Sequence, residues 1–164
     1  MNKRSSKKET TEELPLSKAA ENLLSEARMV LPGIQALFGF QLIVVFSSIF
    51  AEKLSLTEQR LHLLAIVMVV VAIAIIMTPA AYHRQTGPEK VTQQFIDLLA
   101  TLMLISMLPL ALSLCMEFYL ISQIILGDEL LSLLISIGLF ALFIILWLVV
   151  PRMQGLQRAL GGQR

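Results

Sequence analysis

The chain has 164 residues, of which 56% are hydrophobic and only 15% charged, and its mean hydropathy is +0.76. A typical soluble domain carries roughly 25% charged residues, so this composition argues against an ordinary soluble protein. The 13 basic and 12 acidic side chains nearly cancel, which leaves no electrostatic basis for a nucleic-acid partner.

The N-terminal segment divides into a polar tail and an amphipathic stretch. Residues 1–15 are charged and poor in apolar side chains, which predicts a disordered tail. Ser17 can cap a helix over residues 16–29, in which the apolar side chains share one face. We expect this helix to lie along the cytoplasmic membrane surface, and Pro32-Gly33 to mark a bend or a new helix start.

Four stretches without a charged residue follow within residues 30–150. Each is about as long as the roughly 20 residues that a helix needs to cross the hydrocarbon layer. They predict four membrane spans and a short cytoplasmic tail over residues 151–164. The stretches are Val30–Phe50, Leu63–Tyr82, Leu98–Met116 and Leu130–Val150.

The connections between these spans are short and contain helix-capping residues. Ser55 and Glu58 have the spacing of a capping box, while Gly127 suits a helix C-terminus and Asp128 the next N-cap. Such tight connections make consecutive helices antiparallel neighbours. The predicted fold is therefore all-α, an integral membrane four-helix bundle with up-down-up-down order, preceded by a cytoplasmic amphipathic helix.

The basic residues are unevenly divided between the two ends of the predicted spans. If the N-terminus is cytoplasmic, that side receives eleven of the 13 basic residues, and the other side keeps Lys53 and Arg60. The positive-inside rule then predicts that both termini face the cytoplasm. This distribution indicates a multi-pass protein of the plasma membrane.

Polar residues follow one face of the third span. Ser106, Pro109, Ser113 and Glu117 lie at i, i+3, i+7 and i+11, which suits a path for a cation or proton. The alternative places Glu117 at the outer headgroup level beside Tyr119, where ionised carboxylates are common. The second interpretation is favoured because acidic side chains are rare inside membranes.

The first two spans contain other candidates. Gln35 and Gln41 are six residues apart and so point to different faces, where each amide can contact a neighbouring helix or line a polar cavity. His83 can accept a proton near neutral pH, or can anchor the helix at the headgroups together with Arg84. A contact from Glu26 to Arg84 across the bundle is also expected as a structural hypothesis.

Several kinds of site find no support in the sequence. His62 and His83 are predicted on opposite sides of the membrane and cannot form a zinc site alone. Cys115 lies in an apolar run and reads as a small buried hydrophobic residue. The chain also has no Gly-rich phosphate loop and no nucleophile motif. We therefore expect no enzymatic activity, no metal and no cofactor.

Two motifs carry a family resemblance. Residues 26–41 contain the pattern E-x-R-x-x-L-P-G-x-Q-x-L-x-x-F, and residues 79–84 contain P-x-A-x-H-R. The chain thereby resembles a family of small, uncharacterised bacterial four-span membrane proteins, some of which are named sodium:proton antiporters. The resemblance implies a bacterial inner-membrane protein with any family site at the cytoplasmic end of the first two spans. The matching residues are Glu26, Arg28, Pro32, Gly33, Gln35, Pro79, His83 and Arg84.

Two functions fit these observations. In the first, a homo-oligomer transports protons or a cation, with Gln35, Gln41, His83 and Glu117 as the motivating residues. In the second, an accessory or scaffold protein docks a protein partner through its cytoplasmic N-terminal segment. The second is preferred because no interior charge pair is evident, whereas intramembrane ionisable groups usually accompany transport.

Overall fold

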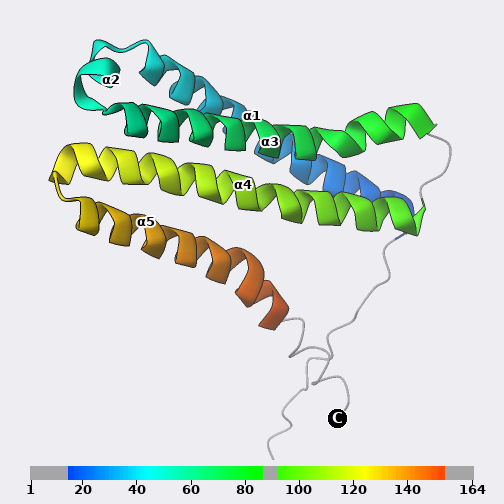
Figure 1. The fold of residues 1–164 in the computed structure, drawn as a ribbon. Coiled ribbons are helices and arrows are strands. Elements are labelled where there is room, and N and C mark those ends of the chain that lie inside the picture. The colour runs from blue at the N-terminus through cyan, green and yellow to red at the C-terminus, as the bar shows by residue number, and fades with distance from the viewer. Residues whose placement is uncertain (1–14, 87–91, 154–164) are drawn as a thin grey trace, which may run out of the picture.

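The computed structural model describes residues 15–86 and 92–153, and within these residues the chain is helical with no β-strand (Figure 1). The predicted N-terminal tail, except for residue 15, and the C-terminal tail beyond residue 153 lie outside this part. The elements are α1 (Leu16–Val45), α2 (Ser48–Lys53), α3 (Leu56–Thr86), α4 (Gln93–Leu126), α5 (Glu129–Ile144) and the π-helix η1 (Ile145–Val149).

Helix α1 is one continuous helix of 30 residues that begins at Leu16 and contains Pro32. The structure therefore joins the expected amphipathic helix to the first span, and no new helix starts at Pro32-Gly33. Proline removes a single backbone donor, and the surrounding turns keep their own hydrogen bonds, so a helix in apolar surroundings can continue through it.

The caps predicted at Ser55, Gly127 and Asp128 are confirmed, whereas the cap predicted at Ser17 is wrong, because α1 begins at Leu16 and has Pro15 at its N-cap position. The backbone N–H and hydroxyl of Ser55 both donate to Glu58 Oε2 at 2.7 Å, and the Glu58 N–H donates back to Ser55 Oγ at 3.4 Å. Gly127 ends α4 with a left-handed φ of 65°, and Asp128 accepts the N–H of Leu131 at 3.0 Å. These local contacts set where α3, α4 and α5 meet their loops.

Helices α3 and α4 form the central pair of the molecule, α1 packs across both of them, and α5 packs chiefly on α4 (Figure 1). Ala65, Val69 and Ala72 on α3 are fully buried, because small side chains let neighbouring helices approach closely. An apolar core of Ile34, Val69 and Ile76 fills the space between α1 and α3. Successive long helices run in alternating directions in the figure.

The face of α5 that meets α4 is marked by two serines. Ser132 and Ser136 are buried, and Ser136 Oγ donates to the backbone carbonyl of Cys115 at 2.7 Å. Cys115 is itself buried, as expected of a small hydrophobic residue. The serine pair therefore faces the neighbouring helix.

The four long helical segments are long and apolar enough to cross a membrane, and large apolar side chains cover their outward faces. Such a surface is unfavourable in water and suits lipid. The protein is therefore a membrane protein by the length and composition of these helices. The segments are Leu16–Val45, Leu56–Tyr82, Gln93–Leu126 and Glu129–Met153.

Candidate functional site

A polar cluster lies inside the molecule, where α1, α3 and α4 meet. It consists of Gln41 from α1, His62 from α3, and Ser113 and Glu117 from α4. His62 is 1% exposed, Ser113 0% and Gln41 3%, while the Glu117 side chain retains 15% of its accessible surface. Buried polar groups are costly unless they are paired, so the contacts among these four residues decide whether the cluster is stable.

His62 uses both ring nitrogens. Its Nδ1 lies 2.9 Å from Glu117 Oε1 and 3.1 Å from Oε2, and its Nε2 lies 3.0 Å from the backbone carbonyl oxygen of Gln41. A carbonyl oxygen can only accept a hydrogen bond, so Nε2 carries a proton and donates to it. The contact with Gln41 thus determines the tautomer of the ring and leaves Nδ1 facing the carboxylate.

The Nδ1 contact requires one further proton. With Nε2 protonated, Nδ1 either donates to an ionised Glu117 or accepts from a protonated one. Both arrangements contain the same number of protons and differ only in which atom holds the shared one. If this proton is lost, a lone pair and a carboxylate oxygen face each other at 2.9 Å, and the cluster carries a negative charge. The contact between His62 and Glu117 is therefore favourable only while the pair holds this proton.

Gln41 links the pair to the rest of α4. Its Nε2 donates to Ser113 Oγ at 3.0 Å and to Glu117 Oε1 at 3.1 Å. Its Oε1 is buried and has no hydrogen-bond partner among the described residues. The side-chain oxygen is thus an unused hydrogen-bond acceptor next to the His62–Glu117 pair.

The cluster lies near the end of the molecule where α1 ends and α3 begins, which we call the α2 end. The ring of Phe50 in α2 meets the His62 ring edge-on, with centroids 5.2 Å apart. A polar pocket of about 270 Å³, lined by Lys53, Glu58, Gln123 and Ile124, opens at this same end. Glu58 lines this pocket and precedes His62 by four residues in α3, so the pocket lies about one helical turn from His62.

The third-span stripe predicted from the sequence is present in the structure. Ser106, Pro109 and Ser113 are buried, and Glu117 is partly buried on the same side of α4. The Glu117 side chain turns inward, where Gln41 Nε2 and His62 Nδ1 give its carboxylate three close polar contacts. The preferred interpretation, which placed Glu117 at the outer headgroup level, concerns its depth in the membrane and stays a prediction.

The other predicted residues are not brought into this cluster. Gln35 is exposed on α1, as are Pro32 and Gly33, whereas Pro79 and Pro109 are buried. Glu26, Arg28 and Arg84 are exposed, and within the described residues no ion pair joins Glu26 to Arg84. The placement of the His83 side chain lies outside the described part of the structure.

His62 is the residue that reading the sequence missed. It precedes Ala65 by three residues and Val69 by seven, so it shares one face of the helix with these two buried residues. That spacing was sufficient to place His62 on the inward face of α3. The spacing could not identify the partner of His62, because Glu117 lies 55 residues away in the sequence.

The side chains of this site suit proton binding better than metal binding. In the described residues no three His, Cys, Asp or Glu side chains gather closely enough to hold a metal ion. One imidazole and one carboxylate, both held by other side chains, are instead suited to binding and releasing a proton.

No curated protein and no solved structure matches the chain significantly. A family profile matches residues 8–151, which include all four long helices and every residue of the polar cluster. This match agrees with the uncharacterised family expected from the sequence. The chain belongs to DUF6328, a family of unknown function.

Proposed function

We propose that this protein is a proton-coupled transporter of the bacterial inner membrane and that His62 and Glu117 form its proton-binding site. The observation that carries the proposal is the 2.9 Å contact between Nδ1 of His62 and Oε1 of Glu117 inside the molecule, which a single shared proton would satisfy. Ionisable side chains within membrane spans are costly and usually mark ion pathways or proton relays.

Binding and release of the shared proton would change how the helices pack. While it is present, it joins α3 to α4, and the same two residues also bind Gln41 of α1. When it leaves, the repulsion between Nδ1 and the carboxylate favours separation of α3 from α4 at the α2 end. Proton binding and release would thereby bias two arrangements of the helices, which is what coupled transport requires.

The surroundings of the pair are polar toward the α2 end and apolar in the opposite direction. The polar pocket at Lys53, Glu58 and Gln123 lies toward the α2 end. In the opposite direction the space is filled by the apolar core around Ile34, Val69 and Ile76. A proton site with a polar pocket toward one end of the molecule and apolar side chains toward the other fits alternating access better than an open channel.

We also propose an orientation of the protein in the membrane and a homo-oligomeric assembly. The positive-inside rule supports four crossings in up-down-up-down order with both termini cytoplasmic, which puts the α2 end on the outer face. Four helices leave little room for a complete path, so we propose a homo-oligomer. Gln35 supports it, because its amide is exposed on a membrane-spanning helix and an amide in lipid favours a partner helix.

The accessory or scaffold function loses its main argument in the structure. It was preferred because no interior charge pair was evident, and the structure brings two ionisable side chains, Glu117 and His62, into contact inside the molecule. The scaffold function remains testable through deletion of residues 1–14, which should release a docked partner without affecting proton movement.

Proton flux into proteoliposomes tests the proposed function. Purified full-length protein is reconstituted with a trapped pH-sensitive dye, and flux is followed after a pH gradient is imposed. Glu117→Gln keeps the shape and hydrogen-bonding capacity of the side chain but removes its ionisable group, so flux should fall at least tenfold. His62→Gln should have a comparable effect.

Glu52→Gln is the matched control, because Glu52 is an exposed carboxylate at the same end of the molecule. It should leave flux at the wild-type rate. Flux that is unchanged in both Glu117→Gln and His62→Gln would contradict the proposal, as would wild-type protein that moves no protons at all.

A further inference from the structure

A second cavity lies away from the polar cluster, between α1, α3, α4 and η1, and has a volume of about 530 Å³. This size falls in the range of roughly 300–1,000 Å³ that small-molecule sites occupy. Its lining is almost entirely apolar and includes Met29, Met103 and Met107. Methionine side chains are flexible and polarisable, and they recur at surfaces that accept ligands of varied shape.

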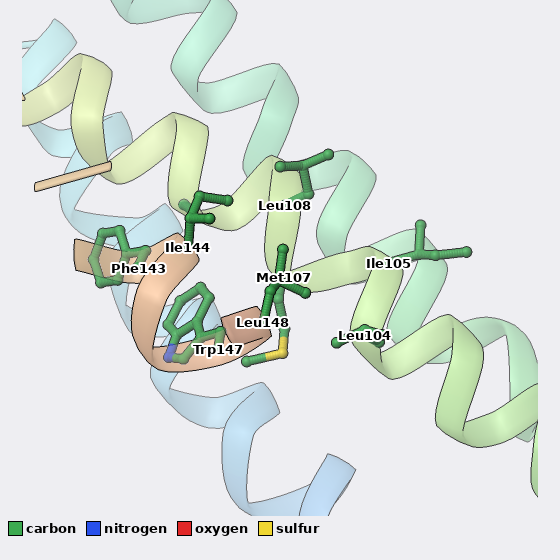
Figure 2. A pocket seen from close by; sticks show the side chains of 9 residues that line it. Leu104, Ile105, Met107, Leu108, Phe143, Ile144, Trp147 and Leu148 are labelled. Atoms are coloured by element: carbon green, nitrogen blue, oxygen red, sulfur yellow. The ribbon is translucent and has the colours of Figure 1, made fainter. Parts of the chain in front are cut away.

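Trp147 of the π-helix η1 forms part of one wall of this cavity. Its indole ring stacks on the ring of Phe143, with ring centroids 4.7 Å apart. Trp147 and Met107 also line an adjoining apolar pocket of about 220 Å³ between α4 and the α5–η1 segment, and Figure 2 shows them there. Short π-helical turns frequently occur at functional sites, and here one positions an indole ring between two cavities.

The charge of the lining selects the ligand. Of the residues that line the 530 Å³ cavity, all within the described part of the chain, Glu26 alone carries a charge. A phospholipid headgroup needs a basic partner for its phosphate, and this lining offers none. A carboxylate and an indole ring together favour a positive charge on an apolar body, through ion pairing and cation–π attraction.

We propose that this cavity binds lipophilic cations, with Glu26 and Trp147 as the groups that recognise the charge. The ligand class is an organic cation of aromatic or alkyl bulk that partitions into membranes. The cavity is separate from His62 and Glu117, so this inference holds or fails independently of the proton-coupled function.

Intrinsic fluorescence tests the inference directly, because Trp147 is the single tryptophan of the chain. Full-length protein in nonionic detergent is titrated with tetraphenylphosphonium and, separately, with tetraphenylborate, an anion of the same shape. We expect saturable quenching by the phosphonium at concentrations at least fivefold lower than by the borate. Glu26→Gln should weaken phosphonium binding roughly fivefold, the upper end for a partly exposed ion pair, and leave borate binding unchanged or stronger.

Two further variants complete the test. Glu21→Gln removes an exposed carboxylate on the same helix that does not line the cavity, and it should bind the phosphonium as the wild type does. Ala100→Phe fills the cavity from α4 and should abolish saturable quenching by both ions. Circular dichroism confirms that each variant is folded.

Three results would overturn the inference. The first is equal affinity for the two ions, and the second is wild-type phosphonium affinity in Glu26→Gln. Either would identify an apolar site for lipid tails. The third is quenching that never saturates, which would indicate partition into the micelle with no site at all.

Discussion

Nδ1 of His62 lies 2.9 Å from Oε1 of Glu117, and this contact joins α3 to α4 between residues 55 positions apart in the sequence. The backbone carbonyl of Gln41 accepts a hydrogen bond from the other ring nitrogen, so the contact with Glu117 depends on a shared proton. In the proposed function, proton binding at this site changes how tightly the three helices pack.

The coupling energy between His62 and Glu117 should be large. We expect a double-mutant cycle of His62→Ala and Glu117→Ala to give about 2 kcal/mol, because residues in one buried network couple by roughly 0.5–3 kcal/mol. Reversible unfolding in mixed micelles measures the four free energies. The exposed pair Lys18 and Glu21, 3.3 Å apart, serves as the control and should couple by less than about 0.5 kcal/mol. Similar values for both pairs would show that the buried contact is energetically unimportant.

Gly127 and Gly138 should respond in opposite ways to alanine. Gly127 has a φ of 65°, so Gly127→Ala should lower the free energy of unfolding by about 1–2 kcal/mol even though the space around it is open. Gly138 lies inside α5, also in open space, and Gly138→Ala should raise stability by up to about 1 kcal/mol through helix propensity. Thermal unfolding in detergent measures both changes. Equal effects in the two variants would contradict this explanation.

Cysteine labelling should place the α2 end on the outer face of the membrane. In a Cys115→Ala background, a membrane-impermeant maleimide should label Lys53→Cys in intact cells. It should label Arg152→Cys only after the membrane is permeabilised, because the positive-inside rule puts that residue in the cytoplasm. The reverse pattern would overturn the proposed orientation, and labelling of both sites in intact cells would argue against four crossings.

Gln35 should lie at the interface between protomers. In the same Cys115→Ala background, Gln35→Cys should form disulfide-linked dimers in membranes. Leu134→Cys is the control, since Leu134 is 57% exposed on α5 but has no polar group to favour a partner helix. Gln35→Leu should also reduce the dimer fraction measured at fixed protein-to-detergent ratio. Cross-linking that is equal at both positions would indicate random collision.

Part of the polar cluster could be predicted from the sequence. The i, i+3, i+7, i+11 spacing put Ser106, Pro109, Ser113 and Glu117 on one face, and the structure confirms that shared face. The headgroup position of Glu117 was preferred because acidic side chains are rare inside membranes. That judgement could not include His62, which supplies the contact that makes an inward position favourable.

The sequence by itself determined the four long apolar segments and the caps at Ser55, Gly127 and Asp128. Hydropathy and capping depend on residues within one segment or one turn, so they can be read locally. Only the tertiary structure decided that Gln41, His62 and Glu117 meet, that Gln35 does not join them, and that Glu26 and Trp147 border one cavity. These relationships depend on how α1, α3, α4 and η1 are rotated and crossed against one another. Helix rotation and crossing result from packing between segments far apart in the chain, which no single stretch of sequence contains.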